Sequence, residues 1–186
     1  MRNQLLAMAV TCGLCAYAGA AELNVSELDL ALVKQGWGVA QRDRGVTSNA
    51  LTIAGQPFAR GVGTHAPSTL WVELDGKATA FRAQCGVDGG AGARGTVRFM
   101  VVGDGRVLWK SDVLKGGQAA VPVQVDLAGV KSLLLIAADA GDGKDHDHAN
   151  WADAVVTFDG EQPKLAAGGG EIREVLTPPA PAAPRI

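Results

Sequence analysis

The stretch TVRFMVVGDGRVLW, residues 96–109, decides the class of fold. Apolar side chains stand at every second position of its first half, at Val97, Phe99 and Val101. This period of two is typical of a β-strand that buries one face. Asp104-Gly105 follows, and this dipeptide between two apolar runs is a strong signal for a tight hairpin turn. The stretch therefore predicts two antiparallel strands joined by a short turn.

The same alternation extends over most of the chain, from residue 24 to residue 159. It recurs in residues 70–74 and 121–125, and residues 154–158 supply a last strand. Residues 133–138 are apolar on both faces, which predicts a central strand, whereas Pro122 places its own strand at a sheet edge. No long helical period competes with this pattern. We predict an all-β protein of about eight or nine antiparallel strands, folded as a sandwich or barrel.

Length and charge narrow the class of protein. The chain has 186 residues, a formal net charge of −2 and no block of basic residues. Its length suits one domain with additional segments. The missing basic block argues against nucleic acid as a partner.

Residues 1–20 predict a secretory signal peptide. Arg2 precedes an apolar run at residues 5–16, and small residues follow at 18–20. The run is short for a membrane span, so we expect a secreted or periplasmic protein with no span after cleavage. An uncleaved anchor is the alternative. Cleavage would remove Cys12 and Cys15 and leave Cys85, which we expect to be a small buried core residue.

The other end of the chain, residues 160–186, predicts a Gly/Pro-rich linker or tail. Three glycines at 168–170 precede TPPAPAAP at 177–184, and proline-rich runs of this kind form stiff, extended linkers. We favour the linker, which would make this chain the front part of a longer protein.

The densest polar cluster is DAGDGKDHDHANWAD, residues 139–153, which we predict to be a loop beside the core. Three interpretations stay open. Closely spaced Asp and Asn oxygens with glycines suit Ca²⁺. His146 and His148 suggest a transition metal, although two His two positions apart on an extended loop point in opposite directions. Asp and Gly are also common in ordinary turns.

Two further segments carry candidate binding residues. His65 lies in GVGTHAPS, residues 61–68, as a ligand contact or as a histidine held by backbone hydrogen bonds. Trp37 stands between two glycines and can present a flat face of the kind that stacks on sugar rings. Catalysis has little support, because the chain has no Gly-x-Ser-x-Gly elbow and its spacing singles out no carboxylate pair.

Taken in order, these segments resemble the NPCBM family, which is related to family 51 carbohydrate-binding modules. The resemblance covers about residues 25–159 and rests on GWG (36–38), RGVGTHAPS (60–68), GVD (86–88), DG (104–105), LWKS (108–111) and GDGKDHDHANWAD (141–153). It implies a jelly-roll β-sandwich of the galactose-binding-like type. It also implies binding of galactose-containing or related glycans, usually with a structural calcium ion.

The resemblance further implies an attached catalytic domain. Such modules are commonly joined to glycoside hydrolases, including family 27 α-galactosidase-like enzymes and family 98. This chain would then be the non-catalytic, N-terminal targeting part of such an enzyme. The alternative is a protein-interaction or adhesion module of a cell-surface assembly.

The candidate site residues follow from the same resemblance. For the glycan we expect a stacking tryptophan and side chains that orient hydroxyls: Trp37, Trp151, His65, Asp147 and His148. For the calcium ion we expect three carboxylates: Asp88, Asp142 and Asp153.

Overall fold

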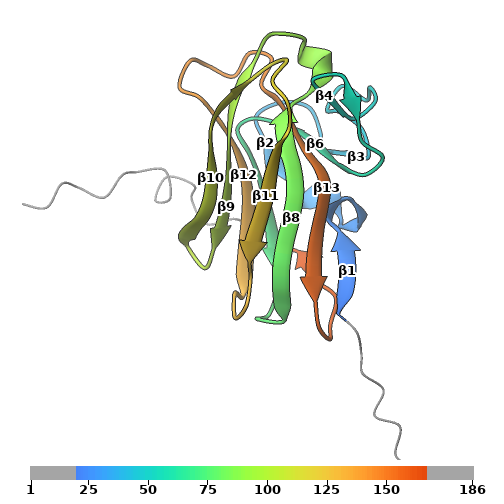
Figure 1. Cartoon of the computed structure of the whole chain (residues 1–186), viewed down its shortest axis with the longest axis vertical. Coiled ribbons are helices and arrows are strands. Elements are labelled where there is room, and N and C mark those ends of the chain that lie inside the picture. Colours follow the sequence, from blue (N-terminus) through green and yellow to red (C-terminus); the bar gives the residue numbers. More distant parts are fainter. Residues whose placement is uncertain (1–19, 167–186) are drawn as a thin grey trace, which may run out of the picture.

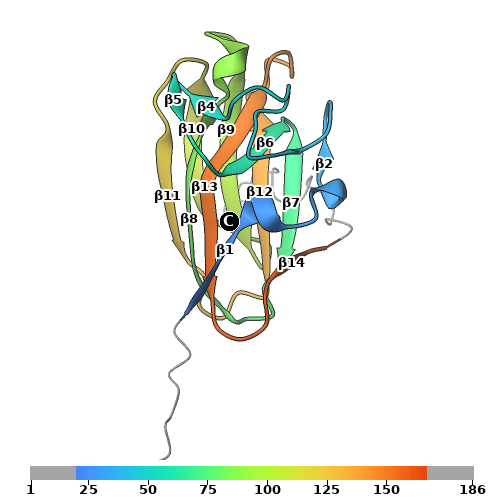
Figure 2. The same ribbon diagram turned by 90° about the vertical axis from the view of Figure 1, so that its right-hand side faces the viewer.

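The computed structural model describes residues 20–166, which form a sandwich of two antiparallel sheets (Figures 1 and 2). The first sheet has the strand order β11-β8-β13-β6-β3, and β1 also pairs with β13. The second has the order β10-β9-β12-β7-β14, and β2 also pairs with β7. Figure 2 shows the two layers facing each other, with β13 in one and β12 in the other. The prediction of an all-β sandwich is confirmed.

Within residues 20–166, the eight strands from β6 to β13 have at least five residues each, and the others are shorter. The strands are β1 Ala21–Asn24, β2 Lys34–Gln35, β3 Gln41–Arg42, β4 Thr52–Ile53, β5 Gln56–Pro57, β6 Gly61–His65, β7 Ser68–Glu73, β8 Ala78–Val87, β9 Thr96–Gly103, β10 Arg106–Lys115, β11 Val121–Asp126, β12 Ser132–Asp139, β13 His148–Phe158 and β14 Lys164–Leu165. Three short 3-10 helices complete the elements of this range: η1 Val25–Glu27, η2 Leu30–Leu32 and η3 Gly89–Ala91.

The predicted hairpin is the turn between β9 and β10. Asp104 and Gly105 have φ values of 47° and 77°, and a two-residue hairpin loop of type I′ requires positive φ at both positions. The Asp104 carboxylate accepts hydrogen bonds from the backbone N–H groups of Lys131 and Ser132. The hairpin is therefore tied to the start of β12, its neighbour in the sheet.

Two predictions of strand position are also confirmed. Strand β11, which contains Pro122, lies at the edge of the first sheet, and β12 lies between β9 and β7 in the second. The apolar residues of β12 are buried on both faces of the sheet. Leu133 and Leu135 belong to the core between the sheets. Leu134 and Ile136 belong to a separate cluster that also includes Trp71.

The thiol of Cys85 lies in the core, as predicted. The residue is 0% exposed, and burial raises the pKa of its thiol to about 12. We expect a chain without residues 1–20 to show no reaction with a thiol reagent at pH 8 until it is unfolded, because only the thiolate is nucleophilic. Rapid labelling of Cys85 in the native state would mean that the core opens locally.

The limits of the folded region differ from the prediction. We expected a module spanning residues 24–159, whereas the strands run from Ala21 to Leu165. The two additional segments pair in the sheets, β1 with β13 and β14 with β7. The predicted signal peptide and most of the predicted linker fall in residues 1–19 and 167–186, outside the described residues. Between residues 20 and 166, no helix has the length and apolar character to cross a bilayer.

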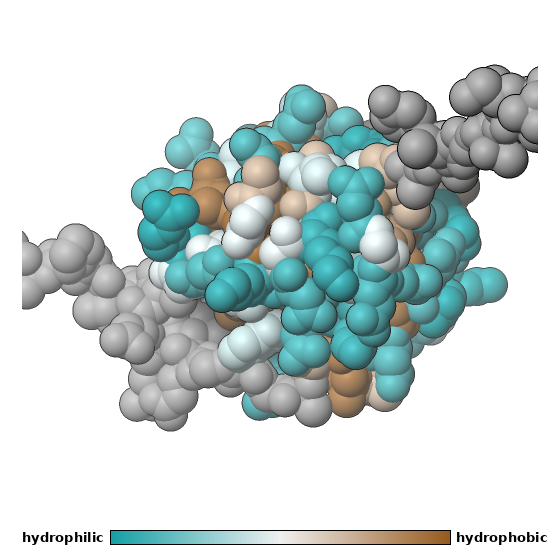
Figure 3. Space-filling model, turned by 90° about the horizontal axis from the view of Figure 1, so that it is seen from below, coloured by the Kyte–Doolittle hydropathy of each residue, from teal (hydrophilic) through white to brown (hydrophobic). Residues whose placement is uncertain are grey.

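The prediction that residues 139–153 form one loop is wrong for their second half. Strand β13 begins at His148, so only the residues before it connect β12 to β13. This connection lies at the upper end of the sandwich in Figures 1 and 2. The opposite end, seen in Figure 3, presents mostly hydrophilic residues. The polar residues of the β12–β13 connection are therefore at the upper end.

Candidate functional site

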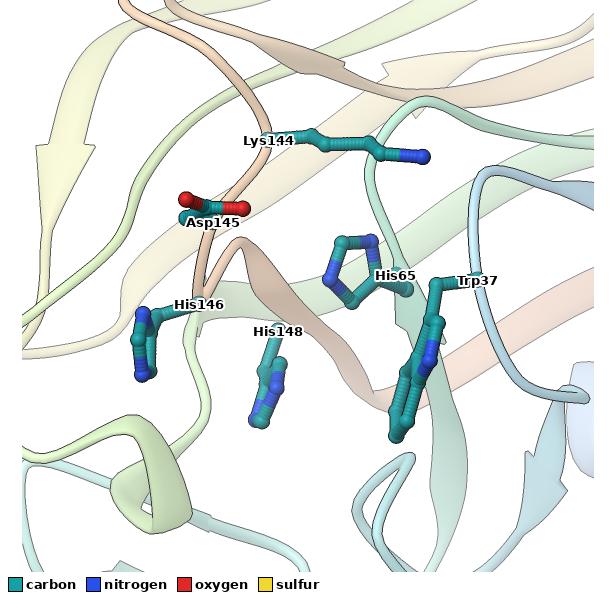
Figure 4. A pocket seen from close by; sticks show the side chains of 6 residues that line it. All are labelled: Trp37, His65, Lys144, Asp145, His146 and His148. Carbon is teal, nitrogen blue, oxygen red and sulfur yellow. The ribbon is translucent and has the colours of Figure 1, made fainter.

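An open pocket of about 220 Å³ lies where three segments meet (Figure 4). The segments are the loop after β2, the end of β6, and the β12–β13 connection with the start of β13. Its lining consists of Trp37, His65, Lys144, Asp145, His146 and His148. Three of the predicted glycan-binding residues are thus brought together: Trp37, His65 and His148.

The pairing of β6 with β13 places two of these histidines. His65 and His148 are directly opposite each other in the antiparallel ladder, and opposite residues point to the same face of a sheet. Their ring centroids are 5.5 Å apart. The sequence separates them by more than eighty positions, so only the strand pairing brings them together.

The expectation that His146 and His148 point in opposite directions is wrong. His146 has a φ of 68°, in the left-handed region, so the chain does not alternate there as an extended strand would. Both rings line the pocket, with centroids 6.4 Å apart and planes 30° apart. No group of three or more His, Cys, Asp or Glu side chains in residues 20–166 is arranged to hold a metal ion.

Trp37 forms the exposed wall of the pocket. Its side chain is 53% exposed, and its ring lies parallel to that of His148, with 5° between the planes and 6.2 Å between the centroids. The loop beneath it is held by two hydrogen bonds: Gln35 Nε2 donates to the Trp37 carbonyl, and Lys144 Nζ donates to the Gly36 carbonyl. A Cβ on Gly36 would lie 2.8 Å from the ring of Pro67, so this close approach requires glycine.

The two central histidines present different polar atoms. His65 Nδ1 lies 2.7 Å from the Ala66 carbonyl oxygen, which can only accept a hydrogen bond. Nδ1 therefore carries the proton, and in the neutral ring Nε2 is left as an acceptor. The pKa of His148 is lowered, first by burial and then by the nearby His65. A neutral His148 ring is thus favoured in the folded protein.

Trp151 is not a sugar-stacking residue, which corrects the prediction. Its side chain is 0% exposed and packs edge-on against Phe99, with centroids 5.0 Å apart and planes 89° apart. Phe81 contacts it from the first sheet. The cause is strand parity: Trp151 is three positions after His148, so the two side chains point to opposite faces of β13. Trp151 belongs to the core.

Asp147 is also buried rather than presented to a ligand. Its Oδ1 accepts a hydrogen bond from the Thr96 backbone N–H at 2.8 Å, while Oδ2 has no partner among the described residues. Burial raises the pKa of this carboxyl. The Asp147 carbonyl also accepts from the Ala66 N–H. Asp147 therefore holds the pocket's segments together and does not line the pocket.

The three predicted calcium ligands do not form one site. Asp142 accepts a hydrogen bond from the Thr96 hydroxyl, and Asp153 lies in a separate hollow with Arg82 on the first sheet. Asp88 is buried in a third place, beside the 3-10 helix η3. Because the three carboxylates serve separate contacts, the prediction that they share an ion is wrong.

The surroundings of Asp88 resemble a hydrogen-bond network more than a cation site. Asn49 Nδ2 and the Gly90 N–H both donate to Oδ1, at 3.0 and 2.6 Å. Asn150 Nδ2 donates to Oδ2 at 2.6 Å. Calcium requires six to eight oxygen ligands, whereas these neighbours direct N–H groups at the carboxylate. In this arrangement N–H donors occupy both oxygens of the Asp88 carboxylate, so a calcium ion would have to displace them.

This arrangement leads to a prediction about calcium. The melting temperature is expected to change by less than about 1 °C between millimolar calcium and excess EDTA, because an ion that does not bind the native state cannot stabilise it. Differential scanning calorimetry of the metal-stripped protein measures this directly. A rise of several degrees with calcium but not magnesium would show that the Asp88 network rearranges around an ion.

Two pocket residues, Lys144 and Asp145, were not among the predicted site residues, and a third, His146, was considered only as a metal ligand. The sequence does indicate these residues, because they lie in the same polar cluster as His148. Trp151 was predicted instead, because tryptophan rings stack on sugars and because Trp151 lies in one of the family motifs.

Comparison with known proteins identifies the family. The NPCBM/NEW2 domain model matches residues 21–157, so this chain belongs to the NPCBM/NEW2 family. One relative is Alpha-1,3-galactosidase B of Akkermansia muciniphila, which is 35% identical over 142 residues. The match includes 74% of this chain but only 18% of that enzyme, so the chain spans about a fifth of the relative's length.

Solved structures agree on the fold. The CBM51 module of a Clostridium perfringens GH95 protein, solved with methyl-galactose, superposes with a TM-score of 0.68 at 28% identity, covering 74% of this chain and all of that one. CBM51-2 of Clostridium perfringens ZmpB, solved with GlcNAc, has a TM-score of 0.67 at 29% identity, covering 78% of this chain and 32% of that one. The chain is therefore a carbohydrate-binding module similar to CBM51.

Proposed function

We propose that this protein binds galactose-containing or related glycans in the pocket between Trp37 and the histidines. The observation that carries this proposal is the exposed Trp37 ring beside the paired His65 and His148. Aromatic faces contact the apolar C–H faces of sugars, and a few fixed polar groups orient the hydroxyls.

The proposed roles follow from the geometry. Trp37 supplies the flat contact surface. His65 Nε2, as an acceptor, receives a hydrogen bond from a sugar hydroxyl. Lys144 and Asp145 stand at the rim and offer a donor and an acceptor to a second sugar. Affinity for one sugar should be about millimolar, because a single ring buries few atoms.

The value of such weak binding lies in attachment to an enzyme. A module that holds its enzyme on a polymer raises the effective concentration of substrate without any catalytic contribution. Galactosidase activity in the Akkermansia relative and methyl-galactose in the solved CBM51 module support a galactoside as ligand. We therefore propose an exported, non-catalytic targeting module at the front of a glycoside hydrolase.

The test is an NMR titration of isotope-labelled protein with methyl β-galactoside, with methyl β-glucoside for comparison. The galactoside is expected to shift the Trp37 indole N–H and the ring signals of His65 and His148. The hollow around Arg82 and Gln124 serves as the control surface, and its signals should not move.

Three outcomes would contradict the proposal. Shifts confined to the Arg82 hollow would move the glycan site to the face of the first sheet. No shift with any glycan from a folded protein would favour the protein-interaction or adhesion module. Release of nitrophenol from nitrophenyl galactosides by this chain alone would contradict its non-catalytic role.

A further inference from the structure

The second sheet carries an apolar cluster on its outer face, the side turned away from the core. The outer faces of the two sheets differ: on the first sheet, β8 and β11 present polar side chains such as Arg82, Gln84 and Gln124. A polar face of that kind is typical of an antiparallel sheet in contact with water. The members of this outer-face cluster come from β7, β9 and β12: Trp71, Met100, Val102, Leu134, Ile136 and Ala138.

The outer-face cluster is shielded from water. Val102 and Ile136 are 0% and 1% exposed, and Met100 is 4% exposed. All members of the cluster lie on three adjacent strands, and no apolar side chain from a different layer of residues 20–166 joins them. Side chains on the face of a sheet stay open to water on their upper side unless another layer packs on them. The burial therefore points to a cover from outside residues 20–166.

Two buried polar atoms on the same face also point to a cover. Trp71 Nε1 and Thr69 Oγ1 have no hydrogen-bond partner among the described residues. Thr69 and Trp71 are two positions apart on β7, so their side chains point to the same side of the sheet. Buried polar groups are nearly always paired, and both of these groups can donate. A covering segment would supply the missing acceptors through its backbone carbonyls.

The course of the chain after β14 identifies which segment can reach this face. Strand β14 pairs with β7, and the Ala166 N–H donates to the Trp71 carbonyl at 2.9 Å, so the chain leaves residue 166 beside the cluster. Residue 20, in contrast, leads into β1 of the first sheet (Figure 2). Neighbouring strands lie about 4.8 Å apart, so β12 is about 10 Å from β14. The four residues 167–170 span up to about 13 Å and reach that far.

The sequence that follows has the pattern of a covering segment. Residues 171–176 read EIREVL and are preceded by three glycines, which let the chain turn onto the face. Ile172, Val175 and Leu176 are three and four positions apart, so one helical turn would place them on one side. Thr177-Pro178-Pro179 then ends any helical pattern. The segment thus offers one apolar side of about the size of a helical turn.

The charges at the border of the cluster match this segment. Arg98 stands two positions before Met100 on β9, and Lys110 is directly opposite Met100 on β10. Both basic side chains are exposed. The segment carries two glutamates, Glu171 and Glu174, on either side of Arg173. Exposed ion pairs stabilise a fold only slightly, so these charges orient the segment while its apolar side chains hold it.

We propose that residues 171–176 pack on the outer-face cluster, with Ile172, Val175 and Leu176 against Met100, Ile136 and Trp71. The linker then begins at Thr177 instead of residue 160. An attached domain would leave from the outer face of the second sheet, and this fixed exit point shortens the tether that sets its effective concentration. The inference does not depend on glycan binding, because none of these residues lines the pocket of Trp37.

The test is NMR of residues 21–186 with labelled methionine, isoleucine, leucine and valine methyl groups. Met100 is the only methionine in that range, so its methyl signal is unambiguous. Nuclear Overhauser cross-peaks are expected between the Met100 methyl group and methyl groups of Ile172, Val175 or Leu176. These cross-peaks report direct contact, which no change in stability alone could imitate.

Two matched variants measure the contribution of the segment. Ile172→Asp places a charge against the cluster and should lower the melting temperature by about 5 °C, since one isoleucine side chain is no longer buried. It should also abolish the cross-peaks of Met100. Ile186→Asp is the same chemical change beyond the segment and should shift the melting temperature by less than about 1 °C.

Three outcomes would overturn the proposal. Equal melting temperatures for Ile172→Asp and Ile186→Asp, with no cross-peak from Met100 to the segment, would mean that the segment does not cover the cluster. Cross-peaks that appear only between differently labelled molecules of a dimer would make a second copy of the chain the cover. Binding of a hydrophobic dye to the unaltered chain, lost on Ile136→Asp, would mean that the face is open and is covered by a partner such as the attached domain.

Discussion

Replacing Trp151 with alanine is expected to destabilise the protein by about 3–5 kcal/mol, the range for removing a large buried aromatic side chain. Trp151 is 0% exposed and contacts Phe81 and Phe99, so its loss leaves a cavity between the two sheets. In a domain of this size the melting temperature should fall by about 10 °C. Chemical denaturation, followed by circular dichroism, measures the change in the free energy of unfolding.

The matched control for Trp151→Ala is the same chemical change at Trp37. Trp37 is 53% exposed, so Trp37→Ala should alter the free energy of unfolding by less than about 0.5 kcal/mol. Trp151→Phe should recover most of the stability, because the indole N–H of Trp151 has no hydrogen-bond partner among the described residues. Equal destabilisation by Trp37→Ala and Trp151→Ala would contradict the assignment of one tryptophan to the site and the other to the core.

The two tryptophans also show how much of the structure can be predicted from the sequence. The period of two predicted the sandwich, the hairpin at Asp104-Gly105, the edge strand at Pro122 and the central strand at residues 133–138. The same period, extended back from Ala154, Val156 and Phe158, would place Trp151 on the outer face. An irregularity in β13 at Asp153, where φ is 45°, reverses the alternation and turns Trp151 into the core, and the sequence carries no clear signal for it.

Other features of the site lie beyond sequence patterns. The positive φ of His146 places its ring on the same side as that of His148, and a left-handed histidine has no clear sequence signal. Asp88 receives donors from Asn49 and Asn150, 39 and 62 positions away. Such contacts depend on which strands pair, and the single sequence does not contain the strand order. For this reason the sequence did not reveal that the three candidate calcium ligands lie in separate places.

The family resemblance narrowed the choice that the residue patterns left open. It assigned Trp37, His65 and His148 to glycan binding, and the fold brings these three into one pocket. It also selected buried residues such as Asp147, which connects the pocket's segments through Thr96 and Ala66. Residues that characterise a family therefore include those that build a site as well as those that contact its ligand.

Replacing Trp37 with alanine should reduce glycan affinity by about thirtyfold or more, the loss typical of a central aromatic contact. The same residue supplies the exposed wall of the pocket and the flat surface for the sugar, while its removal leaves the core unchanged. Titration calorimetry with the preferred methyl glycoside measures the loss, and Trp37→Phe should retain part of the affinity because it keeps a flat ring.

Val39→Ala provides the control for Trp37→Ala, because Val39 is 68% exposed on the same loop and does not line the pocket. Its affinity should equal that of the wild type. If Trp37→Ala bound the glycan as well as Val39→Ala, the stacking surface would have to lie elsewhere. Since Trp151 is enclosed in the core, the hollow near Arg82 would then be the next place to examine. A loss of glycan affinity in Trp37→Ala with an unchanged melting temperature would show that Trp37 serves glycan binding and is not needed for folding. Trp151 would then be the tryptophan that stabilises the fold.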